Sequence, residues 1–164
     1  MKKRLLHLVR HAKSDWSIGG QSDFDRPLNA RGIHDAPFMA ELWFDFFPSP
    51  KTLHVSASKR TRETAELFVL GHADKILSIQ FHQNLYHASE EHLMEFVQQI
   101  PAAEYEVAII SHNYGISDFA SRLSGQSLVM PTCAIASFEV YSDWNIAAPH
   151  DFHLLHFDYP KRNR

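Results

Sequence analysis

The segment Leu5-Leu6-His7-Leu8-Val9-Arg10-His11 decides the fold class of this 164-residue chain. It is short and mostly apolar, and polar residues and then Gly19-Gly20 follow it. A short apolar run bounded by a loop is typical of a strand that is buried on both faces of a sheet. We therefore predict a strand over residues 5–10, ending directly before His11.

Similar strands recur along the chain, separated by helical segments. The helices are indicated by apolar residues at steps of three to five after the capping residues Asn29, Ser89 and Asn113, and by a Pro or Gly at their ends. Alternating strands and helices predict an α/β fold: a three-layer sandwich with a mostly parallel central sheet, helices on both faces and no cap domain. The strands are expected at residues 5–10, 52–56, 76–81, 106–111, 134–141 and 152–157, with an additional helix over 59–70.

Composition narrows the class of protein. The hydrophobic content of 45% is enough for one core, so we expect a single domain over residues 1–164. The net charge is only -3 and no long run of like charge occurs, which argues against a nucleic-acid partner. Cys133 is the one cysteine, no secretory signal pattern is present, and no apolar run approaches the ~20 residues of a membrane span. We expect a cytoplasmic protein with no membrane partner.

The 12 histidines raise the question of a metal site. No His-Glu-x-x-His motif occurs, and His82, His87 and His92 are five residues apart. On a helix that step rotates by about 140°, so these side chains would not share one face. We expect neither a metal nor another cofactor.

Basic side chains follow three of the predicted strands. Arg10 and His11 end the first strand, Arg60 follows the second, and His112 follows the fourth. Ligands of open α/β sheets bind outside the carboxyl ends of the strands, so these four side chains should converge there. Paired guanidinium donors suit a phosphoryl group, with a carboxylate as the alternative ligand, and an imidazole can attack phosphorus in line. The sequence therefore predicts phosphoryl chemistry at this edge.

Six segments in this order carry a resemblance to a known family. They are Leu8–Ser14 with Trp16, Asp25–Gly32, Ser56–Ala65, Leu85–Ala88, Ser111–Asn113 and Pro131–Ala136. Together they resemble the histidine phosphatase superfamily, which includes the phosphoglycerate mutases, and within it the short SixA-type phosphohistidine phosphatases. The resemblance implies a phosphoglycerate mutase-like fold in which His11 accepts the phosphate and Arg10, Arg60 and His112 complete the phosphate pocket.

The resemblance also implies weaker assignments around the pocket. Ser14, Ser17 and Asn113 are expected to bind substrate, although many relatives have Asn at position 17 and Gly at position 12. Arg62 competes with Arg60 for the phosphate, and the spacing to the following Thr-Ala pair favours Arg60.

The loop before the first helix holds conspicuous charges. Asp25, Arg26 and Arg31 are expected mainly to hold this loop and cap the helix, although they could also border the pocket.

The general acid is missing from its usual place. Relatives that cleave phosphate esters usually have a carboxylic acid beside the pocket, but residues 79–89 contain no Glu, and Asp15 and Glu90 are only substitutes. An imidazole leaves more readily than an alkoxide without a proton, so the substrate is expected to be phosphohistidine. The short connections favour an open pocket and a phosphorylated partner protein, such as a phosphotransfer domain or phosphocarrier.

Two other interpretations remain open at this point. One is a phosphomonoesterase for small molecules that uses Asp15 or a glutamate as the acid. The other is a phosphate-binding module without catalytic turnover.

Overall fold

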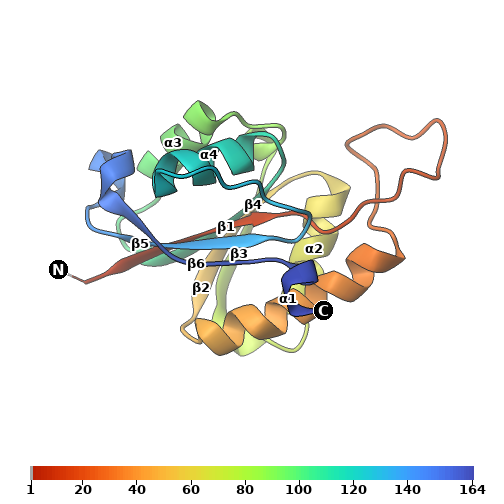
Figure 1. The fold of residues 1–164 in the computed structure, drawn as a ribbon, viewed down its shortest axis with the longest axis horizontal. Helices are drawn as coiled ribbons and strands as arrows, with labels where there is room; N and C mark the ends of the chain where they lie inside the picture. The colour runs from red at the N-terminus through yellow and green to blue at the C-terminus, as the bar shows by residue number, and fades with distance from the viewer. Residues whose placement is uncertain (1) are drawn as a thin grey trace.

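The computed structural model describes residues 2–164 and has a six-stranded sheet at its centre (Figure 1). The strands lie in the order β3-β2-β4-β1-β5-β6 across the sheet. Their bounds are β1 (Arg4–Arg10), β2 (Lys51–Ser56), β3 (Ile76–His82), β4 (Glu106–Ser111), β5 (Ile135–Val140) and β6 (Phe152–Asp158).

Most of the sheet is parallel, as predicted. β1 pairs in parallel with β4, and β2 pairs in parallel with both β3 and β4. β5 is antiparallel to β1, and β6 is antiparallel to β5. The carboxyl ends of β1, β2 and β4 therefore meet at one edge, where residues that follow these strands come together.

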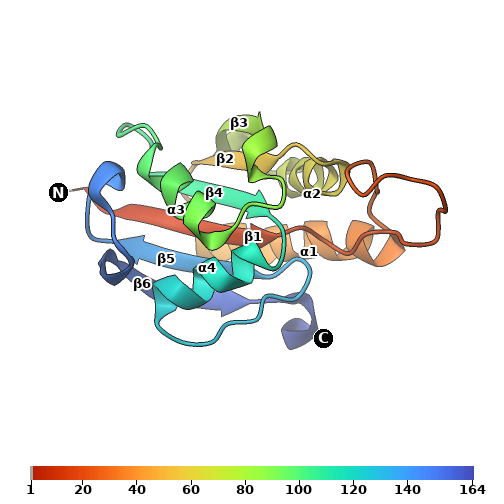
Figure 2. The ribbon, with the colours of Figure 1, turned by 90° about the horizontal axis from the view of Figure 1, so that it is seen from above.

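Two helices cover each face of the sheet (Figures 1 and 2). The helices α1 (Ala30–Phe46) and α2 (Lys59–Val69) share one apolar core, whereas α3 (Glu90–Gln98) and α4 (Gly115–Ser124) share another. These three layers confirm the predicted α/β sandwich without a cap domain. No helix within residues 2–164 combines the length and apolarity needed to cross a membrane.

β1 is apolar on both faces because each face packs into a different core. Leu6 and Leu8 pack beneath α3 and α4, whereas Val9 packs beneath α1 and α2. All three side chains are fully buried. The apolar run that predicted a two-sided strand thus follows from the central position of β1.

Two of the three predicted helix caps form as expected. The side chain of Asn29 accepts a hydrogen bond from the backbone N–H of Gly32, and Ser89 accepts one from His92. The prediction for Asn113 was wrong, because α4 begins at Gly115. The Asn113 side chain instead accepts a hydrogen bond from the Ser117 hydroxyl at 2.5 Å.

Candidate active site

A cavity of about 370 Å³ opens at the carboxyl edge of β1, β2 and β4. Arg10 ends β1 and His11 follows it directly. Arg60 lies in the first turn of α2, and His112 follows β4. All four side chains line this cavity, which places together the residues chosen from three distant parts of the sequence.

His11 is held as a neutral imidazole whose Nε2 is unprotonated and accepts a long hydrogen bond from Arg60 Nε at 3.4 Å. Its Nδ1 lies 2.7 Å from the Ala12 carbonyl oxygen, to which it donates a hydrogen bond, so Nε2 carries the lone pair. Burial, aided by the charges of Arg60 and Arg10, lowers the pKa of His11 to about 3. The Nε2 lone pair therefore stays available near neutral pH.

His112 is the second buried imidazole of the cavity. Its Nδ1 accepts a hydrogen bond from Arg60 Nη2 at 3.1 Å, and its Nε2 lies 2.8 Å from the Ser56 hydroxyl. Burial, together with the neighbouring His11 and Arg60, lowers the pKa of His112 to about 2. His11 and His112 therefore add no positive charge to the cavity near neutral pH, whereas Arg10, Arg26, Arg60 and Lys13 do.

Asp23 anchors Arg60, and sequence analysis missed it. Arg60 donates from Nη1 to the Asp23 backbone carbonyl at 2.6 Å and from Nη2 to its carboxylate at 3.0 Å. Burial would raise the pKa of Asp23, but hydrogen bonds from Tyr86 and Arg26 and the charge of Arg60 hold it well below its usual range. The Asp23 carboxylate is thus an ionised partner that orients Arg60.

Arg26 is the second arginine that binds Asp23, and it also contacts Ser14 and Trp16. It donates to the Asp23 carboxylate at 2.5 Å and to the Ser14 hydroxyl, and its guanidinium lies 3.6 Å from the ring centre of Trp16. Ser14, Trp16 and Arg26 all line the cavity. Arg26 therefore both holds the loop and borders the cavity.

Other residues of the predicted site lie outside the cavity. The Asp15 carboxylate accepts hydrogen bonds from the Ser17 backbone N–H at 2.8 Å and the Ser17 hydroxyl at 2.6 Å; Ser17 is exposed and Asp15 is half-buried. These hydrogen bonds hold the two side chains to each other, and neither residue lines the cavity. Glu90 begins α3 and lines a separate hollow with Asp118. The structure therefore does not place Ser17, Asp15 or Glu90 at the predicted site.

Asn113 and Arg62 differ in their relation to the cavity. Asn113 lines it, although its side-chain oxygen is engaged by Ser117. Arg62 points elsewhere, since its Nε donates to the Ala57 carbonyl at 2.8 Å and its guanidinium lies 4.1 Å from the Phe81 ring centre. Arg60 is thus the arginine of this helix that faces the cavity.

His87 lies at the rim of the cavity, and the segment Leu85–Ala88 did not predict this position. Its side chain is 55% exposed, and Nε2 lies 3.2 Å from the Asp23 carboxylate. Its backbone has a φ of 54°, in the left-handed region, which turns the chain beside the cavity.

Within residues 2–164, no three His, Cys, Asp or Glu side chains are arranged to hold a metal ion.

Comparison with known proteins identifies the family. The histidine phosphatase superfamily (branch 1) matches residues 6–89, the segment that supplies Arg10, His11 and Arg60. The chain belongs to this superfamily.

Relatives of this histidine phosphatase occur in plants and bacteria. An uncharacterised chloroplast protein of Arabidopsis thaliana is 28% identical over 149 residues, covering 85% of this chain and 68% of the relative. A candidate phosphohistidine phosphatase SixA from Nakamurella multipartitia has the same fold, with a TM-score of 0.83, 20% identity and 98% of each chain covered. The protein histidine phosphatase SixA complexed with tungstate superposes with a TM-score of 0.78 and 19% identity, over 98% of this chain and 99% of that one.

Two glycines set the backbone of this histidine phosphatase beside its cavity. A Cβ atom on Gly32, in α1, would lie 2.2 Å from the Lys13 carbonyl oxygen, and one on Gly115, in α4, would lie 1.8 Å from that of Ala88. Lys13 comes two residues after His11, and Ala88 follows His87. Glycine therefore lets each helix approach a loop that carries cavity residues.

Proposed function

We propose that this protein is a phosphatase that carries a transient phosphoryl group on Nε2 of His11 and removes phosphate from phosphohistidine on a partner protein. The observation that carries this proposal is the neutral His11 side chain, whose Nδ1 is bonded to Ala12 and whose Nε2 lies 3.4 Å from Nε of Arg60. An unprotonated nucleophile that a guanidinium holds by one long hydrogen bond is an arrangement suited to phosphoryl transfer, because the same guanidinium can donate to the incoming phosphoryl oxygens.

The reaction proceeds in two displacements. In the first, the Nε2 lone pair of His11 forms a bond to phosphorus while the P–N bond to the substrate imidazole breaks and its electron pair leaves with that imidazole. In the second, the oxygen of a water molecule forms a bond to phosphorus while the P–Nε2 bond breaks and its electron pair returns to Nε2. The proton of the water passes to bulk solvent, and inorganic phosphate departs. Arg10 and Arg60 donate to the equatorial oxygens in both steps, a type of stabilisation worth about 3 kcal/mol per donor in other enzymes.

The acid chemistry of the cavity favours a phosphohistidine substrate. The carboxylate that lines it is Asp23, which is held ionised, and Asp15 and Glu90 lie elsewhere. An alkoxide leaving group needs a strong proton donor, whereas an imidazole needs less help. His87, held by Asp23 at the rim, is placed to give a proton to the departing nitrogen.

The two SixA structures with the same fold support the same substrate class. One is a phosphohistidine phosphatase candidate, and another is a protein histidine phosphatase that binds tungstate, a tetrahedral oxyanion like phosphate. The proposed chemistry uses only side chains of this chain and is therefore expected to continue when a chelator is present.

The test is a substrate panel combined with trapping. We expect faster turnover of a phosphohistidine protein and of phosphoramidate than of sugar phosphates, and an acid-labile, alkali-stable phosphate mapped to His11 by mass spectrometry after an alkaline quench. The variant His11→Asn should show neither. Faster hydrolysis of sugar phosphates would instead identify a small-molecule phosphomonoesterase, and absence of both turnover and phospho-His11 would indicate a phosphate-binding module.

A further inference from the structure

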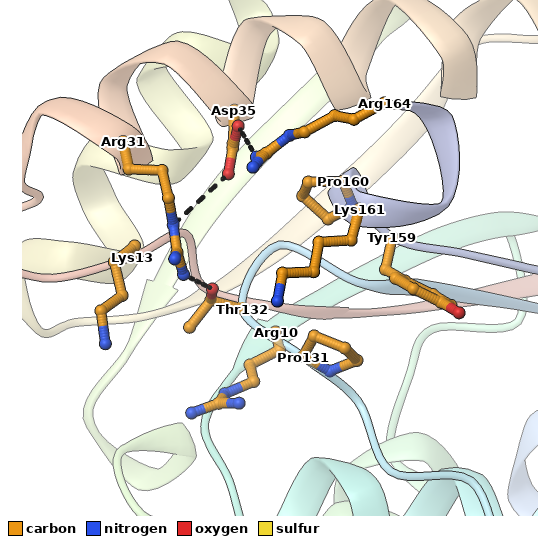
Figure 3. A pocket seen from close by; sticks show the side chains of 10 residues that line it. All are labelled: Arg10, Lys13, Arg31, Asp35, Pro131, Thr132, Tyr159, Pro160, Lys161 and Arg164. Atoms are coloured by element: carbon orange, nitrogen blue, oxygen red, sulfur yellow. Dashed lines mark hydrogen bonds and ion pairs between the residues drawn. The ribbon is translucent and has the colours of Figure 1, made fainter.

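A second cavity, of about 350 Å³, adjoins the first (Figure 3). Arg10, Lys13 and Thr132 line both cavities. The other walls come from α1, from Pro131 before β5 and from the segment after β6, which are parts of the chain that the proposed chemistry does not use. We call this second cavity the basic cavity.

Positive charge dominates the basic cavity, although the whole chain carries a net charge of -3. Its lining includes one carboxylate, Asp35, which is buried. Asp35 is paired with Arg164 at 2.5 Å and lies 3.9 Å from Arg31. The cationic side chains that line it are Arg10, Lys13, Arg31, Lys161 and Arg164.

Several of these cations lack a carboxylate partner. Within residues 2–164, Arg10, Lys13 and Lys161 form no ion pair, since the ion pairs of the cavity are those of Asp35. The Nε atom of Arg10 is buried and has no hydrogen-bond partner. Figure 3 shows Arg31 and Lys161 extending toward Thr132 from different sides. This unpaired charge suits an anionic ligand.

The other walls are apolar and indicate what kind of anion fits. Pro131, Tyr159 and Pro160 line the basic cavity beside the cations. Rings of this kind pack against methylene groups, which a bare inorganic ion does not have. The combination is typical of a site for an organic acid: a short apolar stem with a carboxylate at its end.

We propose that the basic cavity binds an acidic side chain that the substrate carries near its phosphohistidine. Arg10 and Lys13 border both cavities. A phosphoryl group in the first cavity and a carboxylate in the basic cavity would therefore lie on either side of the same two cations, close enough to belong to one substrate. Lys161 and Arg31 complete the carboxylate site with charge-assisted hydrogen bonds. The inference rests on the proposed function and adds substrate selectivity to it.

The test compares peptides that differ in one residue. In a set of phosphohistidine peptides, one neighbouring position from −3 to +3 carries Glu, Gln or Lys. The wild-type enzyme should favour Glu over Gln by about five- to tenfold in kcat/KM at one or more positions, mainly through KM.

Variants of Lys161 assign the preference to the basic cavity. Lys161→Gln should bring the ratio of kcat/KM for the Glu and Gln peptides toward one. Lys161→Glu should make the Lys peptide the preferred substrate. The matched control is Lys75→Gln, because Lys75 directly precedes β3 and so lies at the opposite edge of the sheet. This control should retain the wild-type ratio, and thermal unfolding verifies that each variant is folded.

Two results would overturn the inference: equal rates for all peptides in the wild-type enzyme, or an unchanged Glu preference in Lys161→Glu. Either result leaves the proposed function standing, because the peptides are still hydrolysed. Hydrolysis of none of them would contradict the proposed function instead. In that case, calorimetry with peptides that carry a non-hydrolysable phosphohistidine analogue still tests the basic cavity. Tighter binding of the Glu peptide than of the Gln peptide would support an acidic ligand, and equal Kd values would contradict it.

Discussion

His7 and His11 lie four residues apart on and just after β1, both are buried, and both adjoin cationic side chains, yet their surroundings differ. Nδ1 of His7 accepts a hydrogen bond from the Trp43 indole at 3.0 Å and lies 2.7 Å from the Ser137 hydroxyl, and its Nε2 lies 3.0 Å from the Glu106 carboxylate. Both ring nitrogens of His7 are therefore used within the protein.

The cation beside His7 is equally satisfied. Lys51 is fully buried, lies 3.1 Å from Glu106, and donates to the carbonyl oxygens of Phe47 and Ser49 at 2.7 and 2.6 Å. In the cavity, by contrast, Nε2 of His11 accepts one long hydrogen bond, from Nε of Arg60 at 3.4 Å, and Nε of Arg10 has no partner. Buried polar groups with all bonds made stabilise a fold, whereas unused bonding capacity at a cavity is available to a ligand.

The largest expected effect separates the two histidines by activity. His11→Asn should lower kcat by at least about 10⁴-fold, because the nucleophile is removed, while the Asn amide can replace the Nδ1 hydrogen bond to Ala12. Phosphate release measures kcat, and urea unfolding measures whether the variant keeps its stability. A variant that retained a tenth of the wild-type rate would contradict the assignment of His11.

The next prediction concerns the closed cluster around His7. Lys51→Met should lower the free energy of unfolding by about 3 kcal/mol, because Glu106 loses its buried cation, and should leave kcat unchanged. The control Lys3→Met removes the exposed partner of Glu139 and should cost less than about 1 kcal/mol. Denaturant titration checks both values, and a large loss of kcat in Lys51→Met would show that the two regions are coupled.

A smaller effect is expected where the cavity depends on a positioning residue. Asp23→Asn should reduce kcat/KM by about 10- to 100-fold, because Arg60 loses its ionised partner and is oriented less well. Asp25→Asn is the matched control on the same loop, since the side chain of Asp25 accepts a hydrogen bond from Ser22 and does not line the cavity. A lower kcat/KM in Asp23→Asn with unchanged thermal unfolding would distinguish a positioning role from misfolding. Equal kcat/KM values in the two variants would refute the positioning role of Asp23.

The smallest effect is on the pH dependence of stability. The folded-state pKa of His11 is about 3, below the value near 6.5 expected for an unfolded chain. Between these values the unfolded chain binds the additional proton, so stability is highest above pH 6.5 and falls as the pH falls. His11→Asn should reduce this slope by at most about 1.4 kcal/mol per pH unit, measured by urea unfolding between pH 7 and pH 5. An unchanged slope would show that His11 is not held neutral by the fold.

Sequence patterns predicted the regular part of the molecule because the physical signals there are local or periodic. The apolar runs located the strands, and the carboxyl edge brought Arg10, Arg60 and His112 together as parallel topology requires. Asp23 was missed because its role depends on a contact with Arg60, 37 residues away, from a loop with no periodic pattern. The positions of Asp15 and Glu90 were not predictable either, since short hydrogen bonds hold Asp15 to Ser17 and Glu90 begins α3, outside the cavity.

The close approaches of Gly32 and Gly115 bear on any attempt to redesign this enzyme. Each glycine touches the backbone of a loop that carries cavity residues, so even an alanine there must displace a loop. Activity could then be lost although every residue that contacts substrate is intact. Transfer of the site to another scaffold would need these two backbone contacts as well as the reacting side chains.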